Sequence, residues 1–239
     1  MKLQEKDPEL YLPEKVRITK VEQLTPSEKL FVVEPLESKS IAHDPGQFFQ
    51  VSLLGIGEAP ISISSAPGDG KTFDLSVRAV GNVTNAMHNL DVGDEFYIRG
   101  PFGHGFDKDI CERLIGKKLL FIAGGCGYAP LRSLINMVIA ESKDYKSINI
   151  LYGCKTSHDR MYTNELEEIS HMGGNIELLE TVDNDDETWK GNVGLITTLI
   201  PKVEIDPEET IAIIVGPPIM YKFVLQELLK RDVKKENIY

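Results

Sequence analysis

The fold of this chain is decided by the stretch Gly124-Gly125-Cys126-Gly127-Tyr128-Ala129-Pro130-Leu131, which lies between an apolar run at 118–123 and an amphipathic run at 130–140. Glycines let a backbone approach a ligand closely, and the start of a helix offers unpaired N–H groups and a positive dipole end to a pyrophosphate. A strand, a glycine turn and a helix in this order are typical of a dinucleotide site. The spacing is not GxGxxG, so a tight turn without a ligand stays open as the alternative.

Outward from this stretch, apolar runs alternate with amphipathic ones from residue 116 onward. The apolar runs predict strands at 118–123, 148–153, 176–181 and 211–215. The amphipathic runs predict helices at 130–140, 164–171, 195–200 and 218–230. This alternation predicts an α/β unit, a parallel sheet with helices on both faces.

A second glycine turn, Gly216-Pro217-Pro218-Ile219-Met220, follows the last of these strands. In an open parallel sheet, ligands bind beyond the carboxyl ends of the strands. We therefore expect the two turns to converge on one nucleotide. Taken alone, Pro217-Pro218 is also an ordinary way to enter a helix.

The sequence before residue 111 consists of short β-type runs separated by Gly and Pro. They lie at 16–24, 30–34, 47–53, 61–65, 73–80 and 95–99, with a short helix expected at 84–90. Such spacing predicts an antiparallel barrel or sandwich. We therefore expect two domains, an N-terminal antiparallel β-barrel over residues 1–112 and a C-terminal α/β domain over residues 113–239.

The N-terminal half contains two further candidate motifs. One is Pro60-Ile61-Ser62-Ile63-Ser64-Ser65, which by itself is most simply an edge strand. The other is Val77-Arg78-Ala79-Val80-Gly81-Asn82-Val83-Thr84, which runs from a strand through a glycine into a helix start. The backbone from Gly81 to Thr84 could present N–H groups to a phosphate.

Composition excludes several functional classes. Of the 239 residues, 41% are hydrophobic and 26% charged, as in a globular protein with a real core. The net charge of −11 opposes binding to nucleic acid, whose phosphates require Lys and Arg. No run approaches the roughly 20 apolar residues of a membrane span, and residues 1–10 are charged. We expect a soluble cytoplasmic protein.

We expect no metal site in this sequence. The three cysteines, Cys111, Cys126 and Cys154, form no CxxC pair. The five histidines show no spacing such as HExxH. Cysteines of this number and spacing are most simply reduced thiols.

Together the motifs resemble the ferredoxin:NADP reductase superfamily of flavoproteins, over nearly the whole chain and in the same order. The resemblance rests on Pro45-Gly46-Gln47-Phe48, Pro60-Ile61-Ser62, Val80-Gly81-Asn82-Val83-Thr84, Gly100-Pro101-Phe102-Gly103, the turn 124–131 and Gly216-Pro217-Pro218. Within that superfamily the chain looks most like the electron-transfer subunits of anaerobic sulfite reductase, sulfhydrogenase and class B dihydroorotate dehydrogenase. That further likeness rests on the segments 58–65, 189–194 and 217–223.

The resemblance implies a flavin, FAD rather than FMN, between the two domains. Pro60, Ile61 and Ser62 would line the isoalloxazine, with Ile63 assigned to the same site and Ser62 as the catalytic residue near the atom that accepts hydride. Val80, Gly81, Val83 and Thr84 would hold the flavin diphosphate. The nicotinamide nucleotide would lie on Gly124, Gly125, Cys126, Gly127, Tyr128, Ala129 and Pro130, and on Gly153, Asp183, Gly216, Pro217, Pro218 and Met220.

Two positions depart from the superfamily pattern. The flavin motif usually begins with Arg, and this chain has Ala59, so one phosphate contact must come from elsewhere or be absent. The residue before Gly-Pro-Pro is usually Cys, and here it is Val215, which removes a polarisable thiol from beside the reacting carbon.

The resemblance implies an NAD(P)H-dependent oxidoreductase that transfers hydride to flavin and passes electrons to an iron–sulfur partner subunit. Two alternatives stay open, a free-standing reductase of small acceptors and a non-catalytic assembly subunit that keeps the flavin structurally. We expect NADH rather than NADPH, because only Lys155 and Arg160 supply basic groups after Gly153.

The end of the sequence raises a further expectation. In the similar subunits a cysteine-rich stretch that binds a [2Fe–2S] cluster follows the segment equivalent to 236–239. Here the sequence ends at Tyr239. Either the natural chain continues, which we favour, or electrons pass straight from flavin to a partner; Tyr239 stacking on the flavin is a third, less favoured arrangement. We expect these 239 residues to carry flavin and no iron.

Overall fold

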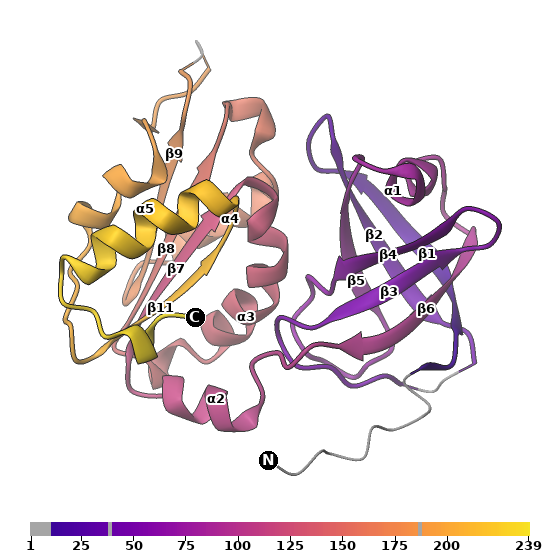
Figure 1. Ribbon diagram of the computed structural model, residues 1–239, viewed down its shortest axis with the longest axis horizontal. Coiled ribbons are helices and arrows are strands. Elements are labelled where there is room, and N and C mark those ends of the chain that lie inside the picture. Colours follow the sequence, from indigo (N-terminus) through magenta and orange to yellow (C-terminus); the bar gives the residue numbers. More distant parts are fainter. Residues whose placement is uncertain (1–10, 38–39, 186–187) are drawn as a thin grey trace.

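The computed structural model describes residues 11–37, 40–185 and 188–239. Two sheets follow one another along the chain and lie side by side (Figure 1). The first is antiparallel and has the strand order β4-β3-β6-β1-β2-β5. Its strands are β1 (Glu14–Gln23), β2 (Glu28–Pro35), β3 (Phe48–Leu53), β4 (Gly57–Ser62), β5 (Phe73–Arg78) and β6 (Glu95–Phe102). The expected two-part architecture, a barrel-like sheet followed by an α/β unit, is confirmed.

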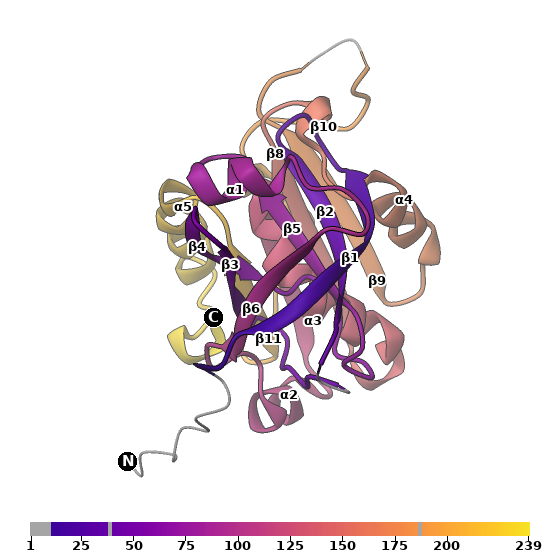
Figure 2. The ribbon, with the colours of Figure 1, turned by 90° about the vertical axis from the view of Figure 1, so that its right-hand side faces the viewer.

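Alternation of apolar and polar residues builds the interior of the first sheet. In β5, Phe73, Leu75 and Val77 are fully buried and face the inside of the barrel. A bridge between Ile63 and Leu75 joins the end of β4 to β5, so the two outer strands of the sheet meet. Helix α1 (Asn82–Met87) lies over one end of this barrel (Figure 2).

The strand containing the first barrel motif begins earlier than predicted. We expected a strand at 61–65, whereas β4 is Gly57–Ser62. Strand β4 lies at the edge of the sheet and pairs with β3. An edge strand tolerates Pro60, which has no N–H to donate. The chain then turns from β3's edge toward β5 at Ile63. As a result Ser62 is the last residue of the strand.

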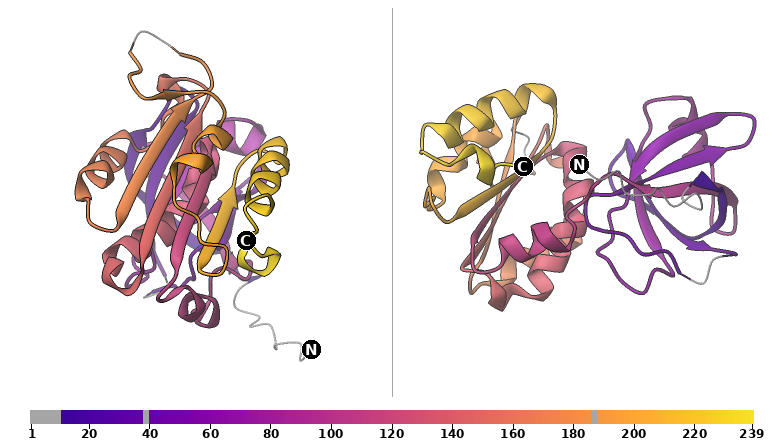
Figure 3. Two further views of the ribbon diagram at one scale, coloured as in Figure 1. Left: turned by 90° about the vertical axis from the view of Figure 1, so that its left-hand side faces the viewer. Right: turned by 60° about the horizontal axis from the view of Figure 1, so that its bottom comes forward.

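The second sheet is parallel, with strand order β10-β9-β8-β7-β11. Its strands are β7 (Lys118–Gly124), β8 (Ser147–Cys154), β9 (Ile176–Val182), β10 (Asn192–Val193) and β11 (Thr210–Val215). Helices α3 (Tyr128–Ala140) and α4 (Thr163–Met172) pack on one face, and α5 (Pro218–Leu229) packs on the other (Figure 3). Helix α3 lies between this sheet and the barrel.

One prediction for the C-terminal half needs correction, and two elements were not predicted. The helix expected at 195–200 is instead two 3₁₀ turns, Ile196–Thr198 and Ile200–Lys202. Pro201 cannot continue an α-helix that would need its N–H, which explains the break. The short strand β10 and helix α2 (Lys108–Leu114) were not predicted. The start of α2 carries a sequence signal, because the carboxylate of Asp107 accepts a hydrogen bond from the N–H of Ile110 at 3.0 Å.

Helix α2 connects the two sheets, and the division expected between residues 112 and 113 falls inside it. In the part of the chain that the structure describes, no helix combines the length and the apolar character needed to cross a bilayer.

Candidate functional site

A cleft of about 670 Å³ lies between the barrel and the carboxyl ends of the parallel strands. Its barrel wall includes Pro60, Ile61, Ser62, Val80 and Thr84. The opposite wall includes the predicted residues Gly124, Gly125, Cys126, Gly127, Ala129, Pro130, Gly153, Asp183, Gly216, Pro217 and Met220. Motifs that are far apart in the sequence therefore face one another across a single cavity.

The two glycine turns pack directly against each other. A Cβ on Gly127 would lie 2.4 Å from the carbonyl oxygen of Val215, and one on Gly124 would lie 2.6 Å from Sδ of Met220. Gly125 differs, because its φ is +53° and a Cβ there would meet no atom within 4 Å. Gly124 and Gly127 thus serve packing between the turns, while Gly125 leaves open space for a ligand to approach the backbone.

On the barrel wall, the turn before α1 is held by its own threonine. Oγ1 of Thr84 accepts hydrogen bonds from the N–H groups of Val80 at 3.1 Å and Gly81 at 2.9 Å. Those two N–H groups are engaged within the protein. The first turn of α1, beginning at Asn82, contains the N–H groups that a helix leaves without intrahelical partners.

Some predicted site residues do not line the cleft. Ile63 is buried at the bridge to Leu75, and Val83 is buried in the barrel interior. Tyr128 is fully buried, with its ring centroid 5.2 Å from that of Tyr152. The remaining two are Gly81, just before α1, and Pro218, the first residue of α5. These five residues can therefore serve a ligand only through their backbone groups or by packing beneath the residues that line the cleft.

Tyr239 does not line the cleft either. Its ring packs 5.7 Å from that of Phe106 and beneath the guanidinium of Arg113. Its backbone N–H donates to the carbonyl of Ala212 beside β11.

Sequence reasoning missed two charged residues of the barrel wall, Glu28 and Arg78. Glu28 has a side chain only 7% exposed, accepts a hydrogen bond from Oγ of Ser27 at 2.8 Å and is bonded to the hydroxyl of Thr25. Arg78 belongs to the second barrel motif, in which the sequence points to the backbone at Gly81 rather than to the arginine side chain. The sequence around Glu28 gives no sign of its place in the cleft, because that place depends on its pairing with Arg78, fifty residues away.

The thiols of the cleft are held in their protonated form. Burial raises the pKa of Cys126 above its usual value, and burial raises the pKa of Cys154 to about 12. Neither group is a thiolate at neutral pH, so the cleft contains no activated cysteine nucleophile.

The end of the cleft beyond β8 offers little positive charge. Arg160 donates from Nε and Nη2 to the two carboxylate oxygens of Glu180 at 2.7 and 2.8 Å, and it does not line the cleft. Asp159 accepts from the N–H of Thr156 at 3.1 Å. Among the described residues that line the cavity, the cationic side chains are Arg78 and Lys155.

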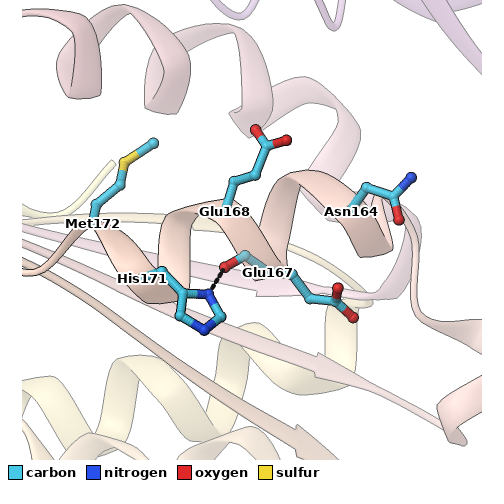
Figure 4. Close-up of a pocket in the computed structure, with 5 residues that line it drawn as sticks. All are labelled: Asn164, Glu167, Glu168, His171 and Met172. Atoms are coloured by element: carbon cyan, nitrogen blue, oxygen red, sulfur yellow. Dashed lines mark hydrogen bonds between the residues drawn. The ribbon is translucent and has the colours of Figure 1, made fainter.

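A second, shallow hollow lies on the outer face of α4 (Figure 4). Nδ1 of His171 donates to the carbonyl of Glu167 at 2.6 Å, while Glu168 and Met172 extend to other sides of the helix. These side chains diverge, and the described residues contain no cluster of three or more metal-ligating groups. We assign no site there.

Comparison with known proteins identifies the family. Residues 121–226 match the oxidoreductase NAD-binding domain family. The chain is 36% identical over 237 residues to the gamma subunit of sulfhydrogenase 2 from Pyrococcus furiosus, covering 93% of this chain and 81% of that protein. This chain belongs to the ferredoxin:NADP reductase superfamily.

Another relative in the superfamily is the probable electron transfer subunit of dihydroorotate dehydrogenase B (NAD⁺) from Methanocaldococcus jannaschii, at 31% identity over 88% of this chain and 71% of that protein. The fold is similar to the flavohem-like FAD/NAD-binding domain of nitric oxide dioxygenase from Vibrio cholerae, with a TM-score of 0.81 and 17% identity. That match covers 94% of this chain and 96% of the other. The superfamily resemblance expected from the motifs is confirmed.

Proposed function

We propose that this protein is a flavoprotein electron-transfer subunit that takes hydride from a nicotinamide nucleotide onto FAD and passes electrons to a redox partner subunit. The observation that carries the proposal is the single cleft, in which Ser62 and its neighbours face the glycine turns of the NAD-binding domain. Relatives named as subunits of sulfhydrogenase and of dihydroorotate dehydrogenase B support the role as a subunit.

The residues present fit a flavin and a nicotinamide nucleotide. On the nucleotide wall, Gly125 opens onto free space where a diphosphate can approach the backbone. On the barrel wall, Val80 and Thr84 line the cleft on either side of Gly81, where a Cβ would have its nearest neighbour at 3.9 Å. Pro60, Ile61 and Ser62 would hold the isoalloxazine, and the turn beginning at Gly124 would hold the nucleotide. FAD held there would supply the chemistry that turns a two-electron hydride into single electrons, which suits a metal-centred partner.

The chain itself supplies orientation. Hydride transfer requires two flat rings held at van der Waals distance. Binding one ring to each wall of the cleft would meet the entropic cost of that alignment before the reaction. Ser62, at the end of β4, lines the cleft, and we assign to its hydroxyl a hydrogen bond to the flavin. No general acid or base is required from the protein.

We further propose residues 1–112 as the flavin domain and residues 113–239 as the nicotinamide domain, a cytoplasmic location, and a partner of iron–sulfur type. A [2Fe–2S] cluster would belong to this chain only if the natural sequence continues beyond Tyr239. The replacements at Ala59 and Val215 keep the assembly-subunit alternative in view, because each removes a contact that usually serves the cofactors.

An anaerobic titration tests the proposal. Protein loaded with FAD should lose its oxidised flavin absorbance when one equivalent of NADH is added. An unbleached flavin would leave only the structural role. Copurification from the native cell then separates a subunit, which arrives with an iron–sulfur partner, from a free-standing reductase, which arrives alone.

A further inference from the structure

Arg132, in α3, crosses from the nicotinamide domain to the barrel. Its Nη1 donates to Oδ2 of Asp74 at 2.7 Å and to the carbonyl oxygen of Ser64 at 3.1 Å, both in the barrel. Its Nε donates to the carboxylate of Glu165 in α4, at 2.7 and 3.0 Å. One guanidinium therefore holds α3, α4 and the barrel together, with a side chain only 13% exposed.

Tyr162 forms the second half of this contact. The guanidinium of Arg132 lies over its ring, 4.7 Å from the centroid. The hydroxyl of Tyr162 hydrogen-bonds Oγ of Ser76 in β5, which in turn lies 3.2 Å from Oγ of Ser64. Tyr162 has a φ of +52°, a conformation that non-glycine residues keep only where their surroundings demand it. We call Arg132, Asp74, Glu165 and Tyr162 the interdomain clasp.

The charge of Arg132 is secured by its setting. Desolvation alone would lower the pKa of Arg132, but the carboxylates of Glu165 and Asp74 raise it overall, so the side chain stays charged. Glu165 belongs to the same domain as Arg132, so moving the domains apart would separate Arg132 from Asp74 and Ser64 of the barrel. Breaking the partly buried ion pair with Asp74 is costly. The clasp thus favours one separation of the domains over others.

The clasp is attached next to both cofactor motifs. Ser64 lies two residues after Ser62, and Arg132 lies two residues after Pro130; Ser62 and Pro130 line opposite walls of the cleft. The hydrogen bond from Arg132 to Ser64 therefore connects the two walls by a short path. A misplacement of reacting groups by about 1 Å can lower a rate about 100-fold.

We propose that Arg132 is a positioning residue that sets the separation of the two walls, and thereby the stacking of nicotinamide on flavin. This inference rests on the proposed function of the cleft. Arg132 itself does not line the cleft, so it would act through the strand that ends at Ser62 and the turn that precedes α3.

The test is the variant Arg132→Lys, in which a single ammonium cannot satisfy Asp74, Ser64 and Glu165 together. We expect flavin content to be unchanged and the Kd for NADH to change by no more than about twofold. The rate of flavin reduction should fall between about 10-fold and 100-fold. The charge-transfer absorbance of stacked nicotinamide and flavin should weaken, and small-angle scattering without nucleotide should show a larger radius of gyration.

Arg160→Lys is the matched control. Arg160 is also 13% exposed and binds a carboxylate, that of Glu180, through two hydrogen bonds, but both partners lie in the nicotinamide domain and neither lines the cleft. This variant should lower stability comparably and leave the reduction rate, the charge-transfer absorbance and the scattering profile as in the wild type.

Equal reduction rates in Arg132→Lys and Arg160→Lys, with the wild-type flavin reduced normally, would overturn the inference and leave the proposed function intact. Loss of flavin or a large rise in Kd would also overturn it, since Arg132 would then serve binding. If Arg132→Lys does not fold, Asp74→Asn breaks the clasp from the barrel side and is judged by the same measurements. If the wild-type flavin is not reduced at all, the proposed function fails, and the scattering comparison decides on the clasp alone.

Discussion

Nε of Arg78 lies 3.3 Å from Oε1 of Glu28, and the two side chains differ sharply in exposure, at 49% and 7%. The buried carboxylate anchors the guanidinium, and the rest of Arg78 faces the cleft. This cation belongs to the barrel, as does Ala59, at whose position the superfamily usually has Arg. Arg78 is the cationic side chain among the described barrel residues that line the cleft, and we therefore expect it to supply the missing phosphate contact.

Replacing Arg78 with Ala should weaken diphosphate binding about 10-fold, the lower end expected for a charge-assisted hydrogen bond. Gel filtration measures how much FAD is retained, and fluorescence titration measures the Kd for the nicotinamide nucleotide, so the two diphosphates are distinguished. Arg99→Ala is the control, because Arg99 pairs with Glu58 on the barrel surface and does not line the cleft. Unchanged affinity for both ligands would contradict the assignment.

The protein should prefer NADH to NADPH. A 2′-phosphate needs basic partners beyond β8, and Arg160 is occupied by Glu180, which leaves Lys155. We expect kcat/KM for NADH to exceed that for NADPH by about 10-fold or more, equivalent to about 1.4 kcal/mol. Comparable efficiencies with the two nucleotides would refute the preference.

Gly127→Val should cripple flavin reduction by the nucleotide while flavin stays bound. The physical cause is a collision of the added side chain with the carbonyl of Val215, not with a pyrophosphate. The variant should therefore also lower the Tm of the C-terminal domain. Loss of flavin from the purified variant would show that the domains do not divide the cofactors as proposed.

Gly125→Ala probes the ligand approach more directly. The site is sterically open, so the substitution should cost about 1 kcal/mol for its positive φ and place a methyl group in the cleft. We expect a higher Kd for the nucleotide and unchanged flavin content. Gly116→Ala is matched, with a φ of +73° and no atom within 4 Å, but it lies outside the cleft. Equal nucleotide affinity in the two variants would argue against ligand contact at Gly125.

Flavin reduction should be independent of pH between about 6.5 and 8. Burial keeps the pKa of both Cys126 and Cys154 above the usual thiol value, so neither thiol titrates in this range. Because the folded-state pKa of each thiol is raised, both thiols stay protonated throughout this range and would lose their protons only at a more alkaline pH. Stopped-flow reduction across the range measures this, and a rate that changes with an apparent pKa near 7 would be the contrary result.

The 239 residues should bind flavin without iron. Cys111, Cys126 and Cys154 lie on separate elements, unlike the local cysteine spacing of a cluster site. Iron and acid-labile sulfide are measured in pure, flavin-loaded protein. Stoichiometric amounts of both would refute the prediction.

Local patterns predicted most of the fold. Alternating apolar residues such as Phe73 and Leu75, and apolar runs such as β7, identify strands. The pattern of buried residues in a strand repeats within a few positions, so a short stretch of sequence is enough to show it. The predicted start of β4 was wrong because it depends on how an edge strand pairs. The helix predicted at 195–200 was wrong because of a single proline, Pro201. Glu28 and the clasp were not foreseen, because Arg132 meets Asp74 across 58 positions and no short pattern encodes that contact.

Met220 sits between two glycines, with Gly216 and Gly124 each so close that an added Cβ would lie 2.4 and 2.6 Å from its thioether group. The floor of the nucleotide site is thus one interlocked block, in which neither turn can be redesigned without the other. An engineer who wishes to change the nucleotide should leave this block untouched. The adjustable part of the site is the outer end of β8 and β9, where Lys155 and Asp183 line the cleft and are exposed, and exposed loop positions tolerate new side chains.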